Sequence, residues 1–228
     1  SRMLNLQGRF VHEVRDLEDK VGAFDLVTNK KVHDSVLSLS GDWRDQIFGS
    51  AANAFSLSYI FGDVRLGKVG FSAETPRGSF SKFELSALRL QSMADRLDLY
   101  MAMRGQITQN NLDSSEKIML SGPNGVRAYP LGESSGDEGL LMNFELRYRI
   151  TDQFQVKTFA DVAYSKLIFQ PFTDDDNYRH LSGVGVGLDW RSSQGFAFSL
   201  EAATRTGERP VSAEDDDIRV WSSVSWYF

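Results

Sequence analysis

The sequence predicts an all-β fold, a transmembrane antiparallel β-barrel. Segments of about ten residues alternate apolar with polar side chains, as strands between lipid and a polar interior do. Short polar turns and long connections join these segments alternately, which is typical of outer-membrane barrels. An apolar run of about 18 residues, as a helical membrane span needs, does not occur. A soluble β-sandwich is disfavoured because each strand would expose an aromatic stripe.

Composition excludes several kinds of site. The 228 residues carry a net charge of -6 and no Cys, so a disulfide scaffold or a thiolate metal site cannot form. His12, His33 and His180 lack the spacing of metal ligands. We therefore expect no metal, no cofactor, no catalytic residue and no nucleic-acid partner.

Five alternating segments precede the middle of the chain. Residues 36–43 put Leu37, Leu39 and Trp43 on one face, as a strand would. The polar stretch 16–31 is expected to be a loop with room for a helical turn, and the pattern slips near Arg89, where we expect a bulge. The five segments are residues 4–15, 36–43, 53–63, 80–90 and 96–106.

Five further segments follow, with clearer alternation. They are residues 140–150, 154–164, 183–190, 196–205 and 218–228. Their polar faces are expected to form a lumen wall of mixed charge, made by Glu145, Arg147, Lys157 and Glu201. Gly183, Gly185 and Gly187 share one inward face, where small residues leave room for a plug.

The stretch between the two sets must be a loop, because its Gly and Pro residues exclude a helix and a strand. Loops this long are usually functional or disordered. Leu120, Val126, Tyr129 and Leu131 give this one apolar side chains to bury, which argues against disorder. Arg127 lies among them, and a guanidinium in such surroundings needs a partner.

Residues 120–148 resemble the signature loop and following strand of the two-partner secretion transporters of the outer membrane. These TpsB-type haemolysin or adhesin activation/secretion proteins belong to the superfamily that also contains the barrel-assembly factors. Val126-Arg127-Ala128-Tyr129 is similar to the family's Val-Arg-Gly-Tyr/Phe motif, and Phe159-Ala160-Asp161 is similar to its Phe-x-Asp-x-Gly motif, with Ala replacing Gly at 128 and 163.

The resemblance implies an organisation for the chain. Residues 1–228 would be the C-terminal part of a sixteen-stranded barrel, about its last ten strands. The first strands and the periplasmic POTRA domains would be absent from this chain. Residues 106–139 would be an extracellular loop folded into the lumen.

The resemblance also assigns roles within that loop. Arg127 would contact the inward Asp161 of the Phe159 motif, and Tyr129 would pack on the barrel wall. Gly122, Pro123, Gly125 and Val126 complete the loop motif, its glycines and proline shaping the loop. The ending Trp226-Tyr227-Phe228 resembles the signal that the barrel-assembly machinery reads, with Trp226 and Phe228 in phase.

The function implied is a pore that translocates an unfolded haemolysin or adhesin to the cell surface without ATP. Its partners would be that TpsA-type exoprotein, outer-membrane lipid and lipopolysaccharide, and the barrel-assembly machinery. An assembly factor of the same superfamily and a passive diffusion porin remain alternatives. A hydrolase is disfavoured because no outward nucleophile and base pair emerges.

Overall fold

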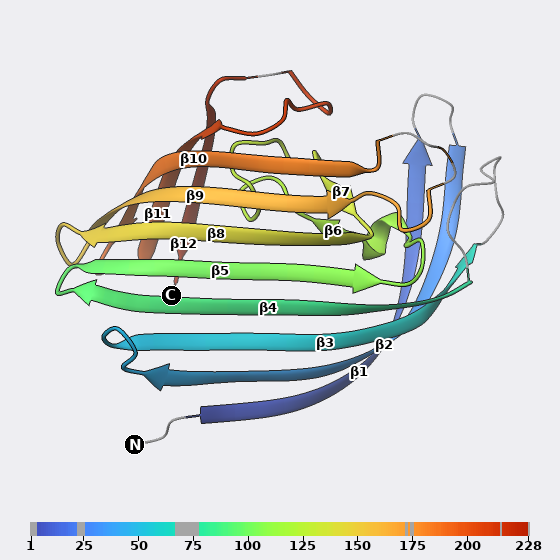
Figure 1. Cartoon of the computed structure of the whole chain (residues 1–228), viewed down its shortest axis with the longest axis horizontal. Helices are drawn as coiled ribbons and strands as arrows, with labels where there is room; N and C mark the ends of the chain where they lie inside the picture. The colour runs from blue at the N-terminus through green and yellow to red at the C-terminus, as the bar shows by residue number, and fades with distance from the viewer. Residues whose placement is uncertain are drawn as a thin grey trace.

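The computed structural model describes residues 4–21, 26–66, 78–171, 173, 176–214 and 216–227. Within them, ten strands form one antiparallel sheet in chain order, which confirms the all-β prediction (Figure 1). The strands are β1 (Leu4–Val21), β2 (Leu26–Asp45), β3 (Ala51–Leu66), β4 (Gly78–Ala94), β5 (Leu97–Thr108), β8 (Glu138–Arg149), β9 (Phe154–Lys166), β10 (Tyr178–Arg191), β11 (Phe196–Arg205) and β12 (Arg219–Trp226).

Every strand pairs with its neighbour in sequence, and β5 pairs with β8 across the central loop, residues 109–137. Five strands precede this loop and five follow it, as predicted. The loop contains a short 3-10 helix (η1, Ser114–Glu116) and a two-stranded sheet of β6 (Ile118–Met119) and β7 (Ser135–Gly136). The sheet curves around it (Figure 1).

The two edges of the sheet differ in their connections. Short turns at 46–50, 95–96, 150–153 and 192–195 lie together at the left edge in Figure 1, whereas the central loop leaves β5 at the right edge and residues 206–214 lie at the top. The predicted alternation of short turns with long loops is confirmed for these connections. The inner face of the sheet is the one that the central loop covers.

Two predictions about the first half were wrong. The described part of residues 16–31 is not a loop, because β1 and β2 continue as a paired ribbon to Val21 and Leu26. Asp16 and Lys31 pair across it at 3.2 Å. These strand ends carry few apolar residues, so apolar alternation does not report their length.

The expected bulge near Arg89 is also absent. Arg89 pairs in regular register with Asn53 and Met101, and the irregularity between β4 and β5 lies between Ser92 and Ala94. The sequence pattern slips at Arg89 because a polar residue occupies an outward position, not because the backbone shifts.

The central loop packs on the inner face through two apolar cores. The β8–β11 core consists of Leu120, Val126, Ala128 and Tyr129 of the loop with Leu141, Phe159, Ala163, Leu181 and Ala203 of the sheet. The β2–β4 core consists of Leu112 of the loop with Val32, Ile60, Val64 and Phe80. Burying one such Leu or Val side chain stabilises the packed loop by about 1.5–3 kcal/mol.

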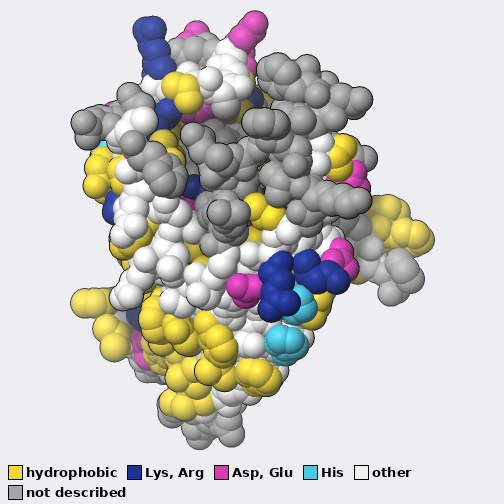
Figure 2. Space-filling view, turned by 90° about the vertical axis from the view of Figure 1, so that its right-hand side faces the viewer, with side chains coloured by type: hydrophobic (Ala, Val, Ile, Leu, Met, Phe, Trp, Pro, Cys, Tyr) yellow, Lys and Arg dark blue, Asp and Glu magenta, His cyan; other side chains and the backbone are white. Residues whose placement is uncertain are grey.

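The outer face is apolar and exposed. Large apolar side chains alternate along the strands with residues of the inner face, among them Leu39, Leu57, Phe83, Leu146 and Val186. Figure 2, which looks from the long-loop side, shows hydrophobic side chains gathered below the loops. Across the described ranges no helix has the length and hydropathy of a membrane span.

Candidate functional site

Arg127 and Asp161 form the centre of the site. Arg127 Nε and Nη2 donate to Asp161 Oδ2 and Oδ1 at 2.9 and 2.8 Å, and the Arg127 backbone N–H donates to Oδ2 at 3.1 Å. The two side chains are 4% and 0% exposed. A bidentate pair is both strong and specific in orientation, so it fixes the loop on β9.

Two more carboxylates meet the same guanidinium. Arg127 Nη1 lies 2.6 Å from Glu145 Oε1 on β8 and 3.0 Å from Glu201 Oε1 on β11. The guanidinium also lies over the Phe159 ring, 3.5 Å from its centroid, a cation–π contact. Burial alone would lower the pKa of Arg127, but Asp161 and its neighbouring carboxylates raise it above the ordinary value.

Other side chains balance the acidic ones. Arg147 binds Glu145 at 2.7 Å, and Lys157 binds Glu201 at 2.6 Å and Asp189 at 3.2 Å. The charges around Arg127 are therefore largely compensated. This matters because an unpaired charge in a buried place is strongly unfavourable.

The loop conformation that presents Arg127 depends on its glycines. Val126 N–H donates to Leu120 O at 2.8 Å, and Gly125 N–H donates to Gly122 O at 3.0 Å. Gly122 has a φ of 91°, a conformation that favours glycine, and a Cβ on Gly125 would lie 2.4 Å from Leu120 O. Pro123 lies inside this tight turn, and Asn143 of β8 binds Gly125 O at 3.1 Å.

Ala128 and Tyr129 fit the neighbouring wall. A Cβ on Gly183 of β10 would lie only 2.5 Å from Ala128 Cβ, so the wall lacks a side chain where the loop carries a methyl group. Tyr129 is fully buried, and its hydroxyl donates to Glu208 O at 2.6 Å. Burial raises the pKa of Tyr129.

A second anchoring point joins the start of the loop to the other half of the sheet. Lys30 of β2 lies 2.8 Å from Asp113, and Lys82 of β4 lies 3.2 Å from Glu116. Arg15 of β1 also contacts Glu116, at 2.5 Å. Burial raises the pKa of Asp113, but hydrogen bonds from Lys30 and Ser115 outweigh it and lower that pKa below the ordinary value.

A third anchoring point lies at the end of the loop. The side chain of Glu133 is fully buried and accepts from Arg179 at 2.7 Å and from the backbone N–H groups of Val211 and Ser212 at 2.9 Å each. Burial raises the pKa of Glu133, but the hydrogen bonds of Ser212 and Val211, with the charge of Arg179, lower it overall. The loop is thus tied to residues between β11 and β12.

Sequence comparison identifies the family. The family model described as "Haemolysin secretion/activation protein ShlB/FhaC/HecB" matches residues 29–190, well over half of the chain. The chain belongs to this family. The predicted relationship to two-partner secretion transporters, and with it the outer-membrane location, is confirmed.

The relatives of this chain within the ShlB/FhaC/HecB family share little sequence identity with it. It is 23% identical over 212 residues to "Heme/hemopexin transporter protein HuxB" of Haemophilus influenzae (strain ATCC 51907 / DSM 11121 / KW20 / Rd), covering 88% of this chain and 37% of that protein. It is 26% identical over 172 residues to "Outer membrane transporter CdiB" of Dickeya dadantii (strain 3937), covering 70% and 30%. The chain therefore spans well under half the length of these relatives.

Two solved structures share the fold of this family member. CdiB from Escherichia coli superimposes with a TM-score of 0.56 at 16% identity, covering 94% of this chain and 49% of that one. CdiB from Acinetobacter baumannii gives a TM-score of 0.54 at 14% identity, covering 99% and 48%. These likenesses support the barrel-type sheet.

The structure brings most residues predicted for the site of this family member together. Arg127, Phe159 and Asp161 meet, and Glu145, Arg147, Lys157 and Glu201 surround them on the inner face, where all four are engaged in ion pairs. Sequence reasoning missed Asn143 and Trp221, whose Nε1 donates to Arg127 O at 2.7 Å. The inward phase of residues 143, 145 and 147 was the available signal for Asn143.

The C-terminal residues lie apart from this site. Trp226 is 58% exposed and stacks on Phe196 at 5.5 Å, and Phe228 lies outside the described residues. Where the structure describes the chain, no group of three or more His, Asp and Glu side chains could bind a metal ion.

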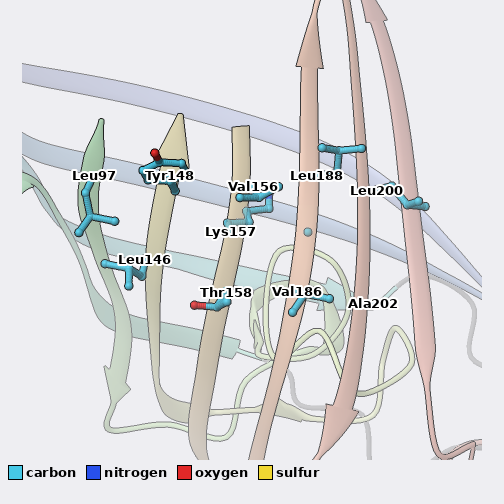
Figure 3. A pocket seen from close by; sticks show the side chains of 11 residues that line it. Leu97, Leu146, Tyr148, Val156, Lys157, Thr158, Val186, Leu188, Leu200 and Ala202 are labelled. Atoms are coloured by element: carbon cyan, nitrogen blue, oxygen red, sulfur yellow. The ribbon is translucent and has the colours of Figure 1, made fainter. Parts of the chain in front are cut away.

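Two hollows differ in character. One of about 470 Å³ lies beside Arg127, lined by Tyr100, Arg104, Asn143, Arg147 and Glu201 among others. Another of about 450 Å³ is almost entirely apolar and is lined by side chains of β5, β8, β9, β10 and β11, including Leu146 and Val186 of the outer face (Figure 3). The polar hollow adjoins Arg127 and its ion pairs, whereas the apolar hollow meets the site only at Lys157.

Proposed function

We propose that this chain contributes to an outer-membrane pore that exports an unfolded exoprotein in two-partner secretion, and that residues 106–139 gate its lumen. The observation that carries the proposal is the buried contact of Arg127 with Asp161, Glu145 and Glu201. The relatives named transporters support the same function.

Gating requires that the loop leave the inner face while the strands stay paired. Its contacts with the sheet are side-chain contacts and two apolar cores, whereas the strands are joined by backbone ladders. Removing one partner of a buried ion pair costs about 3–5 kcal/mol. The docked loop would therefore be the resting state, and a binding partner would have to compensate for its release.

The exported chain would pass along the polar inner face without ATP. Side chains of both signs, such as Arg147, Lys157 and Glu201, would let an extended polypeptide slide without strong attachment. The partners proposed with this function are a TpsA-type haemolysin or adhesin, outer-membrane lipid and lipopolysaccharide, and the barrel-assembly machinery.

The test is secretion of the cognate exoprotein by the full-length transporter. Arg127→Ala and Asp161→Ala should each reduce secretion while heat-modifiable gel mobility shows normal assembly, and the exchange Arg127→Asp with Asp161→Arg should restore part of it. Arg104→Ala is the matched control, because Arg104 is exposed and binds the same loop only at Asn124 O. Normal secretion by the assembled single variants would refute the gating role and favour a passive porin.

A further inference from the structure

A partly buried polar cluster lies on the outer face of the sheet near the short-turn edge. It consists of Asp45 at the end of β2, Asn53 of β3, and Arg89 and Gln91 of β4. These positions are in phase with the exposed apolar residues Trp43, Leu57, Phe83 and Leu85 of the same strands. Polar side chains thus stand where the rest of the face is apolar, and this arrangement is costly in lipid unless they are satisfied and covered.

The polar groups of the cluster form hydrogen bonds with one another. Arg89 Nη1 donates to Asp45 Oδ2 at 2.9 Å and to Asn53 Oδ1 at 2.8 Å, and Asn53 Nδ2 donates to Asp45 Oδ2 at 2.7 Å. Asn53 is 6% exposed and Gln91 only 3% exposed, although both point outward. Something outside the sheet therefore covers them.

The cover is the β2–β3 turn, residues 46–50. Arg89 Nη2 donates to Ile47 O at 2.9 Å, and Gln91 Nε2 donates to Phe48 O and Ser50 O at 3.0 and 3.2 Å. These bonds use the backbone carbonyls of the turn, so its side chains are free to point away. Ile47 is 60% exposed and Phe48 is 92% exposed.

The backbone of Phe48 is itself unusual. The turn is closed by a hydrogen bond from Gly49 N–H to Gln46 O at 3.3 Å, and Phe48 at its third position has a φ of 61°. That position normally carries Gly or Asn, because a side chain is strained there. A phenylalanine here is unfavourable in water both for its strain and for its exposed ring, and an apolar surrounding removes the second cost.

We propose that this turn anchors the protein in the membrane by inserting Ile47 and Phe48 into the phospholipid interface at the short-turn rim. The outer apolar face continues to the turn through Trp43, whose ring lies 6.2 Å from that of Phe55. Aromatic side chains concentrate at this level of outer-membrane barrels, and short turns lie on the periplasmic side. The polar cluster then acts as the internal support of an apolar surface.

The test uses spin labels, since these 228 residues contain no Cys. The full-length transporter, with any cysteine elsewhere replaced by serine, carries Phe48→Cys with a nitroxide in vesicles of phosphatidylethanolamine and phosphatidylglycerol. Asp152→Cys in the exposed β8–β9 turn is the matched control. We expect a ratio of oxygen to nickel-chelate accessibility several-fold higher at 48 than at 152.

Two results would overturn the proposal. Equal ratios at both positions would place Phe48 in water, and low accessibility to both relaxation agents would mean that protein covers it. Adding Arg89→Ala to the labelled protein, with assembly checked by heat-modifiable mobility, should shift the label at 48 toward the aqueous agent and leave the label at 152 unchanged. An unchanged ratio at 48 in that variant would refute the supporting role of the cluster.

Discussion

Lys30 of β2 and Asp113 of the central loop form an ion pair in which 1% of either side chain is exposed, with Lys30 Nζ 2.9 and 2.8 Å from the two carboxylate oxygens. Arg127 meets its carboxylates on the opposite half of the sheet. Asp113 and Arg127 thus attach the central loop to two different halves of the sheet, in addition to the contacts of Glu133, and each of these two attachments can be tested without disturbing the other.

Breaking the second attachment should loosen the loop. Asp113→Ala leaves Lys30 buried without its main counter-ion, and we expect a loss of about 3–5 kcal/mol in loop docking. Lys30→Met combined with Asp113→Leu should cost much less, because no charge remains buried. Protection of loop amides from hydrogen exchange measures the effect, and the exposed Lys31 provides the control, since Lys31→Ala should change docking by about 0–1 kcal/mol.

Acid should release the loop. The pKa values of Asp113 and Glu133 are lowered in the folded protein, below 3.8 and 4.5, so the undocked loop binds more protons than the docked one in this range. Their contribution is complete above those ordinary values and is lost as the pH falls through the lowered ones. Hydrogen exchange of the loop between pH 6 and 3 would show this, with an ordinary surface loop of the barrel as reference; Glu133→Gln should make release less dependent on pH.

A methyl group added at Gly183 of β10 should displace the loop. Removing the facing methyl group of Ala128 from the loop should restore docking. Gly183→Ala would bring its Cβ to 2.5 Å from that of Ala128, an overpacking that costs about 1–3 kcal/mol. Ala128→Gly in the same protein removes the clash. Protease accessibility of the loop should rise in the single variant and return in the double one; a single variant as resistant as the parent would contradict the packing described.

Two substitutions of Tyr129 should separate the contribution of packing to loop docking from that of hydrogen bonding. Tyr129→Phe loses only the bond to Glu208 O, about 1 kcal/mol, whereas Tyr129→Ala empties a fully buried site and should cost about 3–5 kcal/mol. Loop protection in hydrogen exchange ranks the two variants. Equal effects would show that the ring contributes little to docking.

Much of the fold followed from periodicity, because each strand between lipid and a polar interior alternates over its membrane length. The bounds of β8 and β9 were predicted to within two residues, and the inward phase of Asp161 made it available to Arg127. The ends of β1 and β2 were missed because few apolar residues mark them in the sequence.

The remaining contacts could not be predicted from the sequence. Lys30 lies in a stretch that was predicted to be a loop, so its approach to Asp113 had no signal. Glu133 meets Val211 and Ser212, which are distant in sequence and carry no motif. Arg89 looked like an irregularity of the strand, because nothing local shows that a neighbouring turn covers it.

The two-sided attachment of the central loop has a mechanical consequence. The central loop is fixed to β2 and β4 at its start and to β8–β11 further along. It therefore connects the two halves of the curved sheet across its inner face. Because it joins both halves, the docked loop opposes flattening of the sheet, so the curvature of the sheet and the position of the loop change together. Detaching either end should therefore let the sheet change its curvature as well as free the loop.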